Sequence, residues 1–202
     1  MTRPEKPLES APKLVLGSSS TYRRQLLERL GVPFIVDAPA IDETPGADEK
    51  PRTLALRLAR TKARHVAERH PEAIVIGSDQ VADLGGRPLG KPGGFDKAKA
   101  QLRRMSGQVV NFYTALAVIR RTTGFEENVV ARAKVRFRTL TDGEIQRYLH
   151  IEEPYDCAGS AKSEGLGIAL LESIESDDPT TLIGLPLIRT AHLLRAAGLA
   201  LP

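Results

Sequence analysis

Two short apolar segments, each followed by small polar residues, constrain the fold of this chain more than any other feature. Residues 13–17 read KLVLG, and residues 73–77 read AIVIG. Apolar runs of this length between turn residues are typical of buried strands. Between them, residues 53–70 carry apolar side chains at helical spacing and are followed by a proline, which ends a helix. This alternation of strand and helix predicts an α/β fold.

Periodicity and capping signals define the other elements. Apolar and basic residues alternate over 131–138, as in a strand with one buried face, and residues 141–144 (TDGE) form a capping box that begins a helix. Helices alternate with strands early in the chain and strands follow one another later, so we expect a mixed sheet with flanking helices. The expected strands are 13–17, 32–36, 73–77, 109–120, 131–138 and 167–174, the expected helices are 21–30, 53–70, 95–105, 141–149 and 186–197, and the expected loops are 40–51 and 84–94.

Length and composition narrow the class of protein. The 202 residues favour one domain over 13–202, preceded by a disordered tail over 1–12 that is rich in proline and charge. A single cysteine, Cys157, excludes an internal disulfide and suits a reducing compartment. The chain has no tryptophan, which argues against a base-stacking surface for nucleic acid. Because no apolar run reaches membrane-spanning length and no signal peptide is present, we expect a cytoplasmic protein.

A serine-rich turn leads into the first expected helix. Ser18 and Ser20 precede or begin this helix, and Arg23 and Arg24 lie in its first turn. Free backbone N–H groups at a helix start attract phosphate, and arginine presents forked donors that match phosphate oxygens. The alternative interpretation is an ordinary serine N-cap beside two solvated arginines.

Four further residues carry charge at positions suited to a ligand. Lys91 ends a G-x-x-x-x-G-K match that is no P-loop, because Pro92 replaces the required Ser or Thr, but Lys91 can still bind a phosphate. Asp79 follows a buried strand, where α/β proteins bind ligands, although many such residues only cap a turn. Lys62 lies beside the buried face of its helix and Glu43 lies in an acidic loop. Together with the two arginines, these charges suit a complex of a triphosphate with a metal ion.

The order of these motifs resembles the Maf family of nucleoside triphosphate pyrophosphatases. The resemblance extends from residue 13 to about residue 199, with one departure at Thr21, where the family pattern has proline. The matching segments are LGSSSTYRRQLLERLG, the Asp42-Glu43 pair, LA-x-x-KA from Leu58, IGSDQV from Ile76, GKP from Gly90, FYT from Phe112, CAGS-x-KSEGLGI from Cys157 and LIGLPL from Leu182.

The resemblance implies a deep substrate cleft between two lobes and hydrolysis between the α and β phosphates, which releases a nucleoside monophosphate and pyrophosphate. It also implies a divalent cation, magnesium or manganese, on the side of Glu43 and Asp79, with Asp79 as the proton acceptor. The expected phosphate-binding residues are Ser18, Ser20, Arg23, Arg24, Lys62 and Lys91.

Three positions resemble the 7-methyl-GTP branch of this family: Tyr22, Gln80 and Glu164. Methylation at N7 leaves a positive charge on guanine, which favours the face of an aromatic ring such as Tyr22. Glu164 can accept the two N–H donors of the base, and Gln80 can donate to its carbonyl oxygen. The alternative interpretation places Tyr22 in the core and Glu164 in solvent.

Two other functions stay open at this stage. One is a pyrophosphatase of the same family that prefers dTTP or UTP. The other is a non-catalytic nucleotide-binding or nucleic-acid-binding regulator of cell division, in which the basic face of residues 132–138 would contact phosphates; a solvated outer face is the simpler interpretation of that segment. We expect a small-molecule nucleotide as the partner rather than nucleic acid or a membrane, and a homodimer is left open.

Overall fold

The computed structural model describes residues 12–201, so the tail predicted for residues 1–12 lies, except for Pro12, outside the described residues. The described strands form a seven-stranded sheet of order β2-β1-β3-β5-β6-β7, with β4 paired to β3. The elements are β1 (Leu14–Gly17), α1 (Thr21–Glu28), β2 (Ile35–Val36), α2 (Pro51–Arg69), β3 (Ile74–Leu84), β4 (Arg87–Leu89), α3 (Phe95–Met105), β5 (Val109–Arg120), η1 (Arg121–Thr123), β6 (Phe125–Phe137), α4 (Asp142–Glu152), η2 (Ala158–Ser160), η3 (Leu166–Leu170), β7 (Leu171–Glu175) and α5 (Leu187–Ala196).

The sheet changes from parallel to antiparallel at β3. On one side, β1 runs parallel to both β2 and β3, with Gly17 opposite Gly77 at the end of the β1–β3 pairing. On the other side, β3, β5, β6 and β7 pair antiparallel in turn. The predicted α/β fold with a mixed sheet and flanking helices is therefore confirmed.

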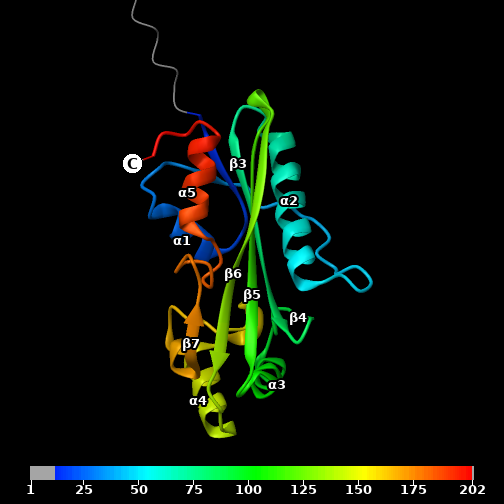
Figure 1. Cartoon of the computed structure of the whole chain (residues 1–202), viewed down its shortest axis with the longest axis vertical. Helices are drawn as coiled ribbons and strands as arrows, with labels where there is room; N and C mark the ends of the chain where they lie inside the picture. Colours follow the sequence, from blue (N-terminus) through cyan, green and yellow to red (C-terminus); the bar gives the residue numbers. More distant parts are fainter. Residues whose placement is uncertain (1–11, 202) are drawn as a thin grey trace, which may run out of the picture.

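Helices cover different parts of this sheet (Figure 1). In one half of the molecule, α2 packs on one face of β1, β3 and β5, and α1 and α5 pack on the opposite face. In the other half, α3 and α4 pack against the far ends of β5 and β6 around Phe112 and Phe137. Within residues 12–201, no helix is both long and apolar enough to cross a membrane.

β3 and the hairpin that follows it differ from the sequence prediction. The strand predicted over 73–77 does not end before Asp79, because β5 pairs with β3 over almost its whole length. Asp79 therefore lies within a strand and not at its end. The loop predicted over 84–94 contains β4, which folds back on β3 through Gly85 and Gly86, both at positive φ as a tight hairpin turn requires.

Two other predicted strands are shorter in the structure. Of the strand predicted over 32–36, only Ile35–Val36 pairs with β1, and both of its side chains are exposed. The strand predicted over 167–174 begins as the 3-10 helix η3, and only β7 pairs with β6. Both predictions were wrong at their ends because a short apolar segment looks alike whether or not another strand pairs with it.

The alternating segment predicted over 131–138 is the second half of β6, which begins earlier at Phe125 and ends at Phe137, and it has one buried face as predicted. Its apolar side chains are buried, from Ala131 to Phe137, and its basic side chains point outward. Two of these basic residues are ion-paired: Lys134 with Glu175 and Arg138 with an acid of α4. The outer face thus has the arrangement of a solvated, partly neutralised strand surface.

Gly77 allows α2 to lie directly against β3. A Cβ atom at Gly77 would stand 2.3 Å from the carbonyl oxygen of Ala59 and 2.5 Å from the backbone nitrogen of Ala63. Any side chain at this position would push the helix off the sheet. Because Lys62 precedes Ala63 on the same helix, this contact also sets how closely Lys62 approaches β3.

We therefore expect Gly77→Ala to destabilise the fold. Overpacking a tight contact costs about 1–3 kcal/mol, which in a chain of this size corresponds to about 2–4 °C in Tm per kcal/mol. The matched control is Gly94→Ala, since a Cβ there meets no atom within 4 Å. Thermal unfolding measures both variants, and equal Tm values would show that the α2–β3 contact does not limit stability.

Candidate active site

A gap in strand pairing along β3 opens a pocket. On one side of β3, β1 pairs with residues 74–77 and β4 pairs with residues 82–84, so residues 78–81 have no strand partner there among residues 12–201. The pocket at this gap has a volume of about 580 Å³. Its walls are formed by the β1–α1 turn, the loop before α2, α2, β3, the turn after β4, and the segments 156–164 and 182–184.

Lys62 holds two carboxylates together in this pocket. Its Nζ lies 2.6 Å from Oδ1 of Asp79 and 2.6 Å from Oε1 of Glu43. Lys62 and Asp79 are buried, whereas Glu43 comes from an exposed loop. Burial raises the pKa of Glu43, but the hydrogen bond from Lys62 and the charges of Lys91 and Arg23 outweigh it and lower the pKa overall. Glu43 is therefore ionised at neutral pH.

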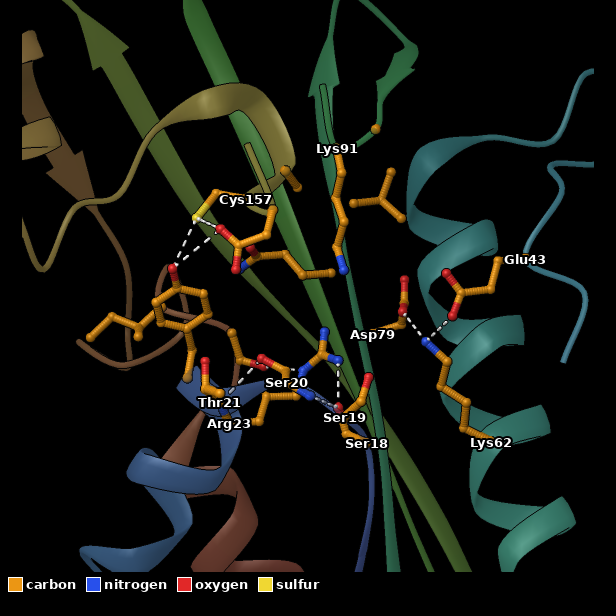
Figure 2. Close-up of a pocket in the computed structure, with 18 of the residues that line it drawn as sticks. Ser18, Ser19, Ser20, Thr21, Arg23, Glu43, Lys62, Asp79, Lys91 and Cys157 are labelled. Atoms are coloured by element: carbon orange, nitrogen blue, oxygen red, sulfur yellow. Dashed lines mark hydrogen bonds and ion pairs between the residues drawn. The ribbon is translucent and has the colours of Figure 1, made fainter. Parts of the chain in front are cut away.

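Arg23 is fixed by the turn that precedes its helix. Its Nη1 donates to Oγ of Ser18 at 3.0 Å, and its Nε donates to the carbonyl oxygen of Gly184 at 3.0 Å. Ser20 caps α1 by accepting the backbone N–H of Arg23. Figure 2 shows Arg23 and Lys91 pointing toward the same space as Asp79. Burial lowers the pKa of Arg23, while the charges of Asp79 and Glu43 oppose this shift.

Arg24 does not join this group. Its side chain is exposed and pairs with Glu28 one helical turn later, at 3.0 Å. Arg24 follows Arg23 directly on α1, and neighbouring helix positions face different directions, so the Arg24 side chain lies on the outer surface. The structure thus brings together every phosphate-binding candidate except Arg24.

Gln80 lines the pocket, but its amide hydrogens are already used. Its Nε2 lies 2.9 Å from Oγ1 of Thr114 and 3.0 Å from the carbonyl oxygens of Thr181 and Leu182. This arrangement differs from the expected donation to a base. Gln80 instead holds the segment 182–184, whose Gly184 carbonyl orients Arg23. LIGLPL from Leu182 was among the matching segments of the sequence but had no predicted role, because backbone carbonyls that accept hydrogen bonds leave no side-chain signature.

The opposite end of the pocket is aromatic and acidic. Tyr22 lines the pocket and is half-buried, so the alternative that places it in the core is wrong. Glu164 also lines the pocket while remaining exposed to solvent. Asp156, which the sequence analysis did not single out, accepts a hydrogen bond from the Tyr22 hydroxyl at 3.4 Å. Asp156 directly precedes the CAGS motif that begins at Cys157, and this position beside a matching motif is the sequence signal that could have identified it.

Cys157 sits beside this aromatic end as a protonated thiol. Its Sγ lies 3.6 Å from the hydroxyl of Tyr22 and 3.5 Å from Oδ1 of Asp156. Burial raises the pKa of the Cys157 thiol to about 12, because it outweighs the opposing effect of the Tyr22 hydrogen bond, and the negative charge of Asp156 adds to the increase. A thiol of that pKa is not a nucleophile at neutral pH.

Two carboxylates of the pocket, those of Glu43 and Asp79, are the residues that would hold a divalent cation. Carboxylate oxygens of Glu43 and Asp79 converge on one point, the Nζ of Lys62. Among the described residues, no group of three or more His, Cys, Asp or Glu side chains could hold a metal. Magnesium is commonly bound by one or two carboxylates together with substrate phosphates, and manganese has similar preferences. Glu43 and Asp79 supply this partial set.

Comparison with known proteins agrees with these motifs. The family described as Maf-like protein matches residues 13–197. Three similar proteins are named 7-methyl-GTP pyrophosphatase: that of Polaromonas sp. strain JS666 is 64% identical over 93% of this chain and 86% of its own. Those of Albidiferax ferrireducens and Bordetella pertussis are 58% and 57% identical, each over 93% of this chain and 94% of its own. On the family match, these identities and the shared pocket motifs, the chain belongs to the Maf family.

Proposed function

We propose that this chain is a nucleoside triphosphate pyrophosphatase that converts 7-methyl-GTP to 7-methyl-GMP and pyrophosphate. The observation that carries this proposal is Asp79, which lies in one pocket with the cations of Arg23, Lys62 and Lys91. The names of the similar proteins support the choice of substrate. We place the activity in the cytoplasm and in a single domain over 13–202, as the sequence analysis expects.

The pocket residues account for each requirement of the reaction. Asp79 accepts a proton from water as the water oxygen bonds to the α phosphorus, and the bond from that phosphorus to the α–β bridging oxygen breaks. Pyrophosphate leaves with the bridging oxygen. Arg23 and Lys91 offset the phosphate charge, which is greatest in the transition state. Lys62 has three N–H donors, of which two meet Asp79 and Glu43, so the third is available to a phosphate oxygen.

A divalent cation held by Glu43 and Asp79 would neutralise phosphate oxygens and make pyrophosphate a better leaving group. We therefore expect 7-methyl-GTP to yield 7-methyl-GMP and pyrophosphate only when magnesium or manganese is present. Chromatography of the products, with and without a chelator, measures this. Release of orthophosphate in place of pyrophosphate would rule out cleavage between the α and β phosphates.

Asp79→Asn should lower kcat by about 10²-fold or more, the usual contribution of a positioned base, because an amide cannot accept the proton. The amide oxygen still faces Lys62, so nucleotide binding should change little. Asp83→Asn is the matched control, since Asp83 is a buried acid on the same strand that caps the hairpin turn through Gly86. Asp79 has no catalytic role if the two variants turn over at similar rates in steady-state assays.

Lys91→Ala should act differently from Asp79→Asn. Lys91 meets phosphate charge in both the ground state and the transition state, so its loss should raise KM and also lower kcat. The same assays report both constants. A pure kcat effect at Lys91 would mean that it contacts charge only in the transition state.

Base selectivity follows from the acidic end of the pocket. The kcat/KM for 7-methyl-GTP should exceed the values for GTP, dTTP and UTP, since Glu164 faces a base with two adjacent N–H donors and a positive ring. Glu164→Gln should narrow this preference by about 1–3 kcal/mol, the scale of one mismatched polar contact. A wild-type preference for dTTP or UTP would instead place the chain in the pyrimidine-selective branch.

A further inference from the structure

An ion pair between the last residue of α4, Glu152, and Lys162 lies next to the acidic end of the pocket. The Nζ of Lys162 lies 2.6 Å from Oε1 of Glu152, and the two side chains are 29% and 13% exposed. The second carboxylate oxygen of Glu152 accepts the backbone N–H of Leu166 at 2.7 Å. These two contacts tie α4 to the turn that carries Glu164.

This turn fits closely around the carboxylate. A Cβ atom on Gly165 would stand 2.6 Å from Oε2 of Glu152, so only glycine fits there without displacing the carboxylate. The backbone N–H of Lys162 also donates to the hydroxyl of Tyr148 at 3.0 Å. The turn is therefore anchored to α4 at Lys162 and again at Leu166.

Lys162 places a positive charge beside the aromatic wall of the pocket. Its Nζ lies 5.9 Å from the centroid of the Tyr22 ring, within the range of a cation–π contact. The hydrogen bond between Lys162 and Glu152 raises the pKa of Lys162 and lowers that of Glu152, so both are charged at neutral pH. The positive charge beside Tyr22 is thus compensated by a negative one.

Neutralisation of the Lys162 charge affects binding because the proposed base, 7-methylguanine, is itself positively charged. A free ammonium beside Tyr22 would repel 7-methylguanine, whereas uncharged guanine would be little affected. With Lys162 neutralised, the remaining charges at this end are those of Asp156 and Glu164, which favour a cationic base.

We propose that the Glu152–Lys162 ion pair is a specificity-determining element, in which Glu152 neutralises Lys162 so that the pocket accepts a positively charged purine. This inference rests on the proposed 7-methyl-GTP function. Glu152 acts here as a positioning residue and a counter-charge without touching the nucleotide.

The test is the ratio of kcat/KM for 7-methyl-GTP to that for GTP, measured at a slightly acidic pH, where the methylated base keeps its N1 proton and its net positive charge. Glu152→Gln removes the charge and keeps one oxygen for the Leu166 N–H, while an amide NH2 replaces the oxygen that faces Lys162. The ratio should fall about fivefold, the effect of one unit charge several ångströms from another in a partly solvated site. Glu153→Gln, the exposed neighbour on the same helix end, is the matched control and should leave the ratio unchanged.

A second variant separates charge from geometry. Lys162→Gln alone should raise the ratio, and the double variant Glu152→Gln/Lys162→Gln should return it to within about twofold of the wild-type value. An unchanged ratio in Glu152→Gln overturns the proposal. So does a reduced ratio that the double variant fails to restore, since Glu152 would then act only through the shape of the turn.

Two further results have distinct meanings. If Glu152→Gln does not fold, the Lys162→Gln variant decides, and a fall in its ratio overturns the proposal. If the wild type releases no pyrophosphate from 7-methyl-GTP, or prefers GTP, the proposed function itself fails. That failure is seen in the wild type alone and cannot be confused with a failure of the ion-pair inference.

Discussion

The buried contact between Lys62 and Asp79 depends on a single close approach of helix to sheet. Because Gly77 has no side chain, α2 packs directly on β3. This places the ammonium of Lys62 2.6 Å from the carboxylate of Asp79. A buried charge without its partner costs several kcal/mol, so Asp79 requires Lys62, which also pairs with Glu43. The end of β1 pairing at Gly17 then leaves Asp79 open to the pocket instead of covered by a strand.

Charge is distributed along the pocket in the order that a nucleoside triphosphate would require. Arg23, Lys62 and Lys91 gather where the β1–α1 turn, α2 and the turn after β4 meet. Asp156 and Glu164 lie near Tyr22 and Cys157 at the other end. A polyanion and a cationic base differ in charge, so such an arrangement orients the substrate before any specific hydrogen bond forms.

Much of this arrangement was predictable from local sequence, and the remainder depended on pairing between distant segments. The turn around Ser18 and the burial of Lys62 were visible in spacing and periodicity. The true position of Asp79 was not, because strand length is decided by partners such as β5 that lie far along the chain. The hydrogen bonds from the Gln80 amide to backbone carbonyls could not be predicted either, because Thr181 and Leu182 also lie far along the chain. Arg24 shows the limit of motif reasoning, since one step along a helix moved it out of the pocket.

The most direct test of this account is a crystal structure of the Asp79→Asn variant with 7-methyl-GTP and magnesium. The account predicts the triphosphate against Arg23, Lys62 and Lys91, with the α phosphorus nearest residue 79 and the base against Tyr22 and Glu164. A nucleotide bound in the reverse direction, or outside the gap along β3, would contradict it.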